Sequence, residues 1–398
     1  MMAAAGMALL VLPALYAGLM GWLRGGVDAA LNEELAVSNE QLAIALLATG
    51  KQVSTFPTDN CSLTFSVLIA ARNEAATLPQ LLRDLAAQTL PAAQFEVLIA
   101  DDHSTDATAA IVAAAAEVTR FTLRLIELPA HATGKKAALL AAQQAARASW
   151  LMCTDADCRV GPGWLAAYAA LLARQPATNF ISGPVLLTGP ESTFTMLMGL
   201  EFAGLVGVGA ACLARQQPTM CNGANLAYRR TAFEAVGGFA DHAHLASGDD
   251  EFLLHNIHAR FPGTARFLFD AAAIVRTAAP PTLRALLRQR VRWASKWAHY
   301  HSAAPQRLAL LVLGANVALA AGVAALLAWP GLWPWVAGAV VLKLGGDGWL
   351  LLPVLTFLGR RQWLAGLLPL QLLYAPYALA VGLAGLRGGY EWKGRAVR

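Results

Sequence analysis

The sequence predicts an α/β domain with a mostly parallel sheet, joined to membrane-spanning helices at both ends of the chain. Between residues 63 and 276, apolar strand-like runs alternate with helical stretches rich in Ala and Leu, as in parallel α/β proteins. Long apolar spans lie before and after this segment, and 57% of the 398 residues are hydrophobic while only 14% are charged. Because the apolar residues concentrate towards the two ends, they indicate membrane helices and not one large soluble core.

Strand-like runs and helical stretches follow one another through the first half of the predicted domain. In chain order they are FSVLIAA (65–71), LPQLLRDLAAQ (78–88), FEVLIAD (95–101), ATAAIVAAAAEV (107–118), FTLRLIEL (121–128) and WLMCTDAD (150–157). Polar residues begin where three strands end, at 72–74 (RNE), 101–106 (DDHSTD) and 155–157 (DAD). Since ligands of such sheets bind at the carboxyl ends of the strands, we expect the functional residues there.

Four apolar spans are long enough to cross a bilayer at about 1.5 Å per residue. They are residues 7–23, 308–328, 334–357 and 363–386. The N-terminal MMAAAGM has no basic residue, so the first span is predicted to be an uncleaved anchor and not a signal peptide. Lys343 and Asp347 lie four residues apart in the third span and are expected to neutralise each other.

A fifth apolar stretch, 194–214, is interrupted by Glu201. A crossing there would place the polar motifs before and after it on opposite sides of the membrane. We therefore expect a buried or interfacial helix.

Charge and cysteine usage exclude several classes of protein. The net charge is +5 and the pI is near 9.1, but the polar segment has no Lys/Arg run interleaved with aromatics, so no nucleic-acid partner is predicted. Five cysteines without a CxxC pair favour neither a disulfide framework nor a zinc site. They are expected to be reduced thiols in a cytoplasmic setting.

Two carboxylates, Asp155 and Asp157, follow a strand that should be buried. A turn after the strand brings such a DxD pair around one divalent ion, and Mg²⁺ and Mn²⁺ favour oxygen ligands together with substrate phosphates. A solvated turn is the alternative for these two residues.

Two further strand-end motifs suit a nucleotide ligand. Asp102 offers an acceptor for a base N–H or a ribose hydroxyl, while Ser104 or Asp106 is expected to cap the next helix. Lys135 opens a helix directly after Gly134, where an ammonium and unpaired backbone N–H groups attract phosphate. An ordinary surface lysine is the alternative.

The third acidic motif is Asp249-Asp250-Glu251. Crowded carboxylates raise the pKa of at least one of them, which makes a general base plausible. An acidic helix start that is favoured by the helix dipole is the alternative.

The segment 283–302, LRALLRQRVRWASKWAHYHS, is basic and aromatic and precedes the C-terminal spans. Helical spacing places Gln289 and Trp293 on one face and Arg292 on a neighbouring face. This arrangement suits stacking on a sugar with a grip on a diphosphate, and it also suits a helix in the lipid interface.

Taken in series, these motifs resemble membrane-embedded family-2 glycosyltransferases with the GT-A nucleotide-sugar fold, a group that includes cellulose, hyaluronan and poly-N-acetylglucosamine synthases and ceramide glucosyltransferase. The stretches that carry the resemblance are VLIAARNEA, LIADDHSTD, TGKKAAL, CTDAD, CNGANLAYRR, SGDDEFL and QRVRW, within residues 65–293.

The resemblance implies a role for each matching residue. On the donor side, the first strand-end loop, with Ala70, Ala71 and Glu74, borders the nucleotide, and Asp102 reads the uracil ring. Lys135 lies near the donor. The DxD pair, Asp155 and Asp157, binds Mg²⁺ or Mn²⁺, with Asp157 as the direct metal ligand. On the acceptor side, Asp250 is the general base, next to Asp249 where the family usually has Glu. The acceptor loop is Cys221, Asn222 and Gly223, and the QxxRW residues are Gln289, Arg292 and Trp293.

The function so implied is inverting transfer of a sugar from a nucleotide donor, expected to be UDP-linked, to a lipid or membrane-associated glycan at the cytoplasmic face of a bacterial inner membrane. The expected segments are an anchor (1–24), a linker (25–62), the GT-A catalytic domain (63–280), an interfacial helix (281–304), about three membrane helices (305–388) and a basic tail (389–398). A processive polysaccharide synthase and a polyprenyl-phosphate glycosyltransferase are the alternatives among enzymes. A membrane transporter or scaffold is the alternative outside them, although it leaves the strand-end carboxylates without a role.

Overall fold

A computed structural model describes residues 2–47, 64–240, 248–295, 303–386, 390–392 and 395–397. Most of the second half of the expected linker and the aromatic residues after Ser295 in the basic segment lie outside these ranges. By their contacts the residues form two compact units, which are described separately. The first comprises Met1–Asp28, Leu186–Met220 and Ala279–Arg398, and the second comprises Ala29–Val185 and Cys221–Ala278.

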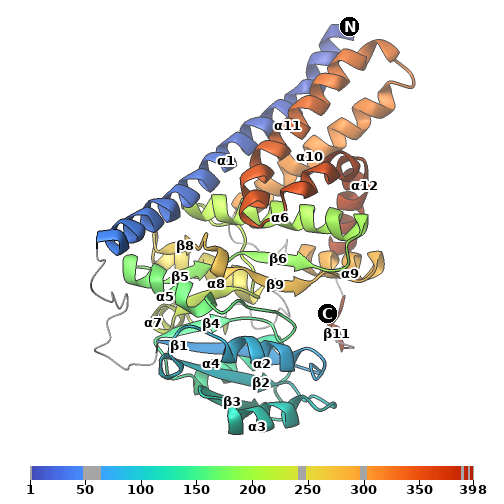
Figure 1. The fold of residues 1–398 in the computed structure, drawn as a ribbon. Coiled ribbons are helices and arrows are strands. Elements are labelled where there is room, and N and C mark those ends of the chain that lie inside the picture. Colours follow the sequence, from blue (N-terminus) through green and yellow to red (C-terminus); the bar gives the residue numbers. More distant parts are fainter. Residues whose placement is uncertain are drawn as a thin grey trace. The chain divides into compact units, whose positions relative to one another are not determined.

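The second unit is built on one seven-stranded sheet of order β3-β2-β1-β4-β7-β5-β8 (Figure 1). Its strands are β1 (Phe65–Ala71), β2 (Phe95–Asp101), β3 (Thr122–Glu127), β4 (Trp150–Cys153), β5 (Phe180–Ser182), β7 (Leu226–Arg229) and β8 (Ala265–Phe267). β1 pairs in parallel with β2 and β4, β2 with β3, and β5 with β8. β7 pairs antiparallel to β4 and β5. The prediction of an α/β fold with a mostly parallel sheet is confirmed.

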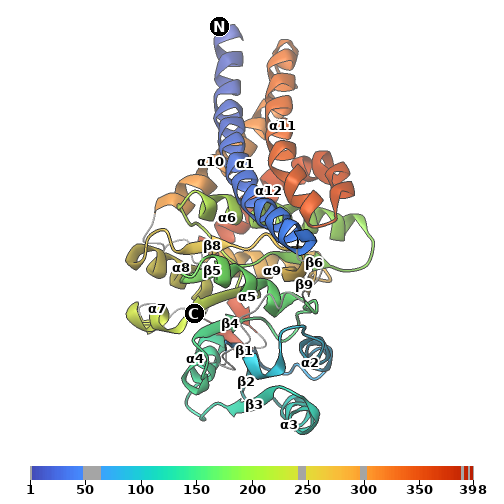
Figure 2. The ribbon, with the colours of Figure 1, turned by 60° about the vertical axis from the view of Figure 1, so that its left-hand side comes forward.

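Helices cover both faces of this sheet. Figure 2 shows α2 and α3 on one face and α4 on the other. The helical segments of the unit are α2 (Leu78–Ala86), η1 (Ala92–Gln94), α3 (Thr108–Val118), α4 (Lys135–Ala145), α5 (Trp164–Arg174), α7 (Arg230–Ala235), α8 (Asp249–Arg260) and η3 (Ala271–Ala273), and the further strand is β9 (Val275–Ala278). Coverage on both faces explains why β1 and β2 read as continuous apolar runs and not as alternating ones.

Strand register brings the polar loops to one edge of the sheet. Ala71 at the end of β1 lies opposite Asp101 at the end of β2, and Leu68 of β1 lies opposite Cys153 at the end of β4. The loops after β1 and β2 therefore begin side by side, and the loop after β4 begins three positions earlier along β1 at the same edge.

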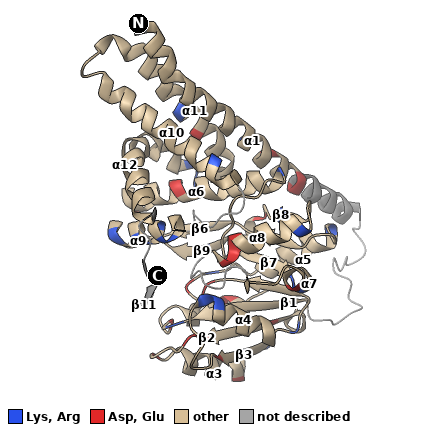
Figure 3. Ribbon diagram, turned by 180° about the vertical axis from the view of Figure 1, so that it is seen from behind, with Lys and Arg blue, Asp and Glu red and all other residues tan. Residues whose placement is uncertain are grey.

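The first unit is helical. Its elements are α1 (Met2–Leu47, up to Asp28), β6 (Val185–Thr188, from Leu186), α6 (Thr193–Ala214), α9 (Leu283–Ala294), α10 (Ala303–Ala325), η5 (Pro330–Leu332), α11 (Trp333–Phe357), η6 (Arg361–Gly366), α12 (Leu367–Leu386) and the antiparallel strands β10 (Tyr390–Trp392) and β11 (Arg395–Val397). Five helical segments of the described chain are long and apolar enough to cross a membrane: Ala3–Glu34, Thr193–Ala214, Ala303–Ala325, Pro330–Phe357 and Arg361–Gly385. Figure 3 shows few charged residues on α1, α10, α11 and α12. Four of the five correspond to the predicted spans, and the other is α6.

Small residues bring α6 close to two of these helices. A Cβ on Gly207 of α6 would lie 2.8 Å from Val354 of α11, and a Cβ on Gly26 of α1 would lie 2.7 Å from the carbonyl oxygen of Ala211 of α6. Close approach at glycine is typical of helix packing in membranes. Most of α6 is buried among its neighbours, and residues 186–220, which lie inside the expected catalytic segment 63–280, cluster with the helical unit.

The predicted pair within α11 is formed. Lys343 Nζ lies 2.5 Å from Asp347 Oδ2. Tyr16 of α1 and Gln371 of α12 also donate hydrogen bonds to the Asp347 carboxylate. The pair therefore neutralises its own charge and in addition connects three helices of the unit, which is the usual arrangement of ionisable residues among apolar helices.

Candidate active site

The two loops after β1 and β2 are bonded to each other. Arg72 donates to the carbonyl oxygen of Asp102 (2.7 Å), and Asp106 accepts from the N–H groups of Ala75 (3.1 Å) and Thr108 (3.0 Å). Asp106 therefore binds the start of α3, as one of the two predicted capping residues. The side chain of Asp102 accepts a hydrogen bond from Gly134 instead. Asp106 therefore binds the helix start, and Asp102 is left as the residue predicted to read the ligand.

Asp102 faces the loop that precedes α4. Its Oδ2 accepts the N–H of Gly134 at 3.1 Å, and the residue is 1% exposed. Gly134 has a φ of +96°, in a region that favours glycine, and Lys135 follows as the first residue of α4. Asp102, predicted to read the base, is therefore bonded to the residue directly before Lys135, the predicted donor lysine.

The remaining donor-side residues lie at the end of β1. Ala70 and Ala71 are its last two residues. The Glu74 carboxylate accepts the Thr77 hydroxyl at 2.9 Å, and the carbonyl oxygen of Glu74 accepts the N–H of Leu78 at 2.9 Å. Glu74 therefore stabilises the turn into α2, and it is nearly buried there.

The DxD pair follows β4 directly. Oxygen atoms of Asp155 and Asp157 and the sulfur of Cys158 lie within 4.8 Å of one another. Burial, followed by the charges of Asp155 and Asp157, raises the pKa of the Cys158 thiol, and sulfur is a poor ligand for Mg²⁺ and Mn²⁺ compared with carboxylate oxygen. The two carboxylates that remain fit Mg²⁺ or Mn²⁺, which prefer oxygen ligands and keep positions open for phosphate.

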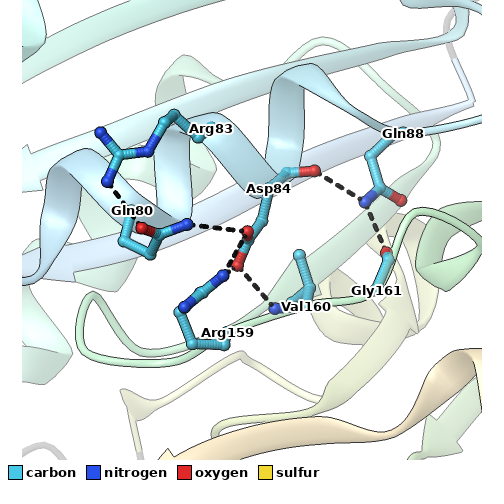
Figure 4. A network of polar contacts seen from close by, with 7 residues as sticks. All are labelled: Gln80, Arg83, Asp84, Gln88, Arg159, Val160 and Gly161. Carbon is cyan, nitrogen blue, oxygen red and sulfur yellow. Dashed lines mark hydrogen bonds and ion pairs between the residues drawn. The ribbon is translucent and has the colours of Figure 1, made fainter.

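A polar network holds the chain just beyond this pair (Figure 4). Asp84 on α2 accepts two hydrogen bonds from the Arg159 guanidinium, at 2.5 and 2.9 Å, and one from the N–H of Val160 at 3.3 Å. Gln88 on the same helix donates to the carbonyl oxygen of Gly161 at 2.7 Å. Because Arg159 lies two residues after Asp157, α2 fixes the exit of the DxD turn.

We expect Asp84→Asn to raise the Mn²⁺ concentration that gives half-maximal activity by roughly three- to tenfold, because a charge-assisted fork is replaced by a weaker bond. Activity at saturating Mn²⁺ should remain within about twofold of wild type, since no metal ligand is removed. A Mn²⁺ titration of nucleotide release from the sugar donor that the resemblance implies measures this. Arg83→Ala is the matched control, because Arg83 bonds only to Gln80 within this network; an equal change in both variants would contradict a specific role of Asp84.

Charged groups from four segments converge beside the DxD pair. Lys135 Nζ lies 2.6 Å from Asp155 Oδ1, and the N–H of Gly223 donates to Asp250 Oδ2 at 2.7 Å. A Cβ on Gly223 would lie 3.3 Å from Asp250 Oδ2 and 3.5 Å from Lys135 Nζ. The predicted metal pair, donor lysine, acceptor loop and base therefore meet at one place.

The electrostatics of this cluster follow from burial and from like charges. Burial alone lowers the pKa of the Lys135 ammonium, but the carboxylates of Asp155, Asp249 and Asp250 outweigh it and raise that pKa. Burial raises the pKa of the Asp249 carboxyl, Lys135 opposes the shift, and Asp250 adds to it. Lys135 therefore keeps its positive charge for an anionic ligand.

The sign of the charge in this cluster indicates what it binds. The carboxylates of Asp155, Asp249 and Asp250 act on the Lys135 ammonium, Lys136 acts on Asp249, and Asp157 lies beside Asp155. Among these residues the acidic side chains outnumber the basic ones. A diphosphate does not bind such a surface unless a cation neutralises it, so the cluster and a divalent ion together match a nucleotide diphosphate.

Asp250 and Asp249 open α8. Gly248 precedes them with a φ of +87°, and α8 begins at Asp249. The second Asp250 oxygen, Oδ1, accepts the N–H of Glu251 at 2.9 Å. The acidic helix start considered in the sequence is therefore present, and the same turn places Asp250 against Gly223.

The QxxRW residues lie on α9 of the first unit. Trp293 packs on Phe202 of α6 with ring centroids 6.2 Å apart, and Gln289 accepts a hydrogen bond from Arg290 at 2.6 Å. Arg292 lies in the last turn of the helix. These three residues stay a prediction for the acceptor and diphosphate contacts.

Comparison with known proteins identifies much of the second unit, together with residues 186–220 of the first. Residues 66–237 match the family model described as "Glycosyl transferase family 2". They form a glycosyl transferase family 2 domain. The match ends before Asp249 and Asp250, so their roles rest on the resemblance and on the geometry given above.

Relatives of known name agree with the family 2 domain. A "Probable glycosyltransferase YdaM" from Bacillus subtilis is 27% identical over 58% of this chain and 54% of its own length. A "Beta-monoglucosyldiacylglycerol synthase" from Nostoc sp. is 28% identical over 48% of this chain and 41% of its own length. The chain thus spans about half, or less, of the length of these relatives. The structure of mannosyltransferase PcManGT from Pyrobaculum calidifontis, in complex with GDP-Man and Mn²⁺, superposes with a TM-score of 0.50 at 21% identity, over 92% of this chain and 99% of that one, and confirms the GT-A fold.

Several residues that build the family 2 domain escaped the sequence analysis. Asn225 is fully buried and accepts from Trp164 Nε1 (2.9 Å) and the Tyr168 hydroxyl (2.8 Å). It also donates to the carbonyl oxygens of Pro184 (2.7 Å) and Ala273 (2.9 Å). It therefore fixes the acceptor loop two residues after Gly223. The only hint in the sequence was that Asn225 directly precedes the apolar residues Leu226, Ala227 and Tyr228, which suggests a buried amide.

Proposed function

We propose that the chain is an inverting glycosyltransferase that moves a sugar from a nucleotide donor to a lipid or membrane-associated acceptor. The proposed donor is a UDP-linked sugar. The observation that carries the proposal is the convergence of Lys135, Asp155, Gly223 and Asp250, the first three of which lie within the residues that match family 2. A transporter or scaffold has no use for this arrangement, because it combines a metal pair, a cation and a fixed carboxylate.

The proposed step is a single displacement. The Asp250 carboxylate takes the proton of the acceptor hydroxyl, the acceptor oxygen bonds to the anomeric carbon, and the bond from that carbon to the diphosphate oxygen breaks with both electrons going to the nucleotide. Attack from the side opposite the leaving group inverts the anomeric configuration. Gly223 and the N–H of Glu251 hold the two Asp250 oxygens in position for this transfer.

The leaving diphosphate gains negative charge as the bond breaks. Asp155 and Asp157 would hold a Mg²⁺ or Mn²⁺ ion, which supplies Lewis-acid stabilisation of that charge when bound. Lys135 adds a positive charge that its acidic neighbours maintain. The complex of PcManGT with GDP-Man and Mn²⁺ supports this combination of nucleotide sugar and metal.

A lipid acceptor is favoured by the long apolar helices that accompany the domain and by the name of the Nostoc relative. An acceptor that is embedded in the bilayer reaches a catalytic domain at the cytoplasmic membrane surface. A processive polysaccharide synthase is the second candidate, since the residues QRVRW also suit such enzymes.

The test is metal-dependent UDP release by the purified protein in nanodiscs of bacterial lipid extract. We expect UDP release from at least one of UDP-glucose, UDP-galactose and UDP-N-acetylglucosamine with Mn²⁺ or Mg²⁺, and its loss with EDTA. Mass spectrometry of the lipid fraction should show one added hexose or N-acetylhexosamine, whereas a polymer ladder would favour the processive candidate. GDP-mannose tests the nucleotide; no release from any of these donors would refute the proposal.

A further inference from the structure

The QxxRW helix contains a further arginine, Arg290, besides the arginine of the motif. Arg290 is only 4% exposed. Its guanidinium donates through Nε to Glu201 Oε1 at 3.1 Å and through a second nitrogen to Glu201 Oε2. A third nitrogen donates to Gln289 Oε1 at 2.6 Å. One side chain therefore binds both a buried carboxylate and a residue of the motif.

The same guanidinium contacts the aromatic residue of the motif. Its central carbon lies 4.3 Å from the centre of the Trp293 ring, which is within the range of a cation–π interaction. Trp293 is in addition packed on Phe202, the neighbour of Glu201 on α6. The orientation of two motif side chains, Gln289 and Trp293, thus depends on Arg290.

Glu201 is the residue that interrupts the otherwise apolar α6. The Tyr377 hydroxyl of α12 donates to its Oε1 at 3.2 Å, so the carboxylate connects α6, α9 and α12. A buried ion pair contributes little net stability compared with apolar residues of the same size, because both charges lose their hydration. Its retention is better explained by the geometry that it imposes on its neighbours.

We propose that Glu201 and Arg290 are a positioning pair, by which α6 and α12 set the orientation of Gln289 and Trp293 for the acceptor step. This inference rests on the proposed function. Arg290 is not assigned a contact with substrate or metal, and it acts through the side chains of Gln289 and Trp293. The planar fork of arginine is needed, because it bonds the Glu201 carboxylate and the Gln289 amide at the same time.

Three variants separate positioning from simple stability. Glu201→Gln leaves the Arg290 charge buried without its partner and is expected to destabilise the protein. The double variant Glu201→Gln/Arg290→Gln removes both charges and should remain folded. Arg290→Lys keeps an ion pair with Glu201 but loses the bond to Gln289. Asp347→Asn is the matched control, because it breaks another buried ion pair of the first unit, whose bonds run to Lys343, Tyr16 and Gln371.

The experiment measures sugar transfer from UDP-glucose, or from whichever donor the wild type uses, into nanodiscs of bacterial lipid extract, together with donor KM and UDP affinity. We expect the double variant and Arg290→Lys to lose about tenfold or more in transfer at saturating donor, with donor KM and UDP affinity within about twofold of wild type. Asp347→Asn should lower the melting temperature without this selective loss.

The outcomes are distinct. Normal transfer by folded Arg290→Lys and by the folded double variant would overturn the inference, as would an equal loss in Asp347→Asn. Equal losses of transfer and of UDP affinity in both Arg290 variants would also overturn it, because they indicate general damage to the protein. Failure of the wild type to release UDP from any donor would refute the proposed function instead.

Discussion

We expect Asp250→Asn to abolish sugar transfer and to leave UDP affinity nearly unchanged. The amide keeps the size of the carboxylate but does not accept the proton of the acceptor hydroxyl, and loss of a general base costs about 10²- to 10⁴-fold in rate. The diphosphate contacts expected from Lys135 and Asp157 are not removed. Transfer is measured by product mass spectrometry, and UDP affinity is measured by calorimetry with Mn²⁺.

Gly223→Ala is the companion to this variant. Its methyl group would lie 3.3 Å from Asp250 Oδ2, so the carboxylate must shift by a few tenths of an ångström. We expect a partial loss of transfer, smaller than that of Asp250→Asn, with UDP affinity again retained. If Asp250→Asn lost transfer and UDP affinity together, Asp250 would belong to the donor site and the assignment as base would be wrong.

The sequence predicts those parts of the fold that depend on local pattern. β1 and β2 have the predicted bounds, 65–71 and 95–101, because fully buried strands give continuous apolar runs that end at polar residues. α4 begins at Lys135 as predicted. β7 was not predicted, because four residues after a loop show no period, and its antiparallel direction depends on pairing with β4 and β5.

The residues that position the site were beyond sequence reasoning. Asp84 and Arg159 are 75 positions apart, and Glu201 and Arg290 are 89 positions apart. Glu201 stood out because it interrupts an apolar stretch, whereas the other three read as ordinary charged side chains, and only the folded chain shows the partner of each. The reacting groups themselves, such as Asp155 and Asp250, were predicted because they stand in short motifs next to strand or helix ends.

The second large effect is expected when the proposed metal ligand Asp157 is removed. Asp157 is exposed, whereas Asp155 is paired with Lys135 at 2.6 Å. Asp157→Asn should therefore remove a metal ligand without disturbing the ion pair or the stability of the fold. We expect transfer to fall by roughly 10²-fold or more, and we expect Mn²⁺ to lose its effect on UDP affinity. In contrast to Asp250→Asn, this variant weakens donor binding.

Two further variants make the test of Asp157 specific. Cys158→Ser should retain both metal dependence and transfer, because Mg²⁺ and Mn²⁺ prefer oxygen to sulfur ligands and the carboxylates of Asp155 and Asp157 are unchanged. Asp155→Asn should show a mixed effect, since it also releases Lys135 from its 2.6 Å partner. Calorimetric titration of UDP with and without Mn²⁺ distinguishes the three. If Mn²⁺ strengthened UDP binding to Asp157→Asn as much as to the wild type, the metal would be bound by other residues, and the assignment of Asp157 as a metal ligand would be wrong.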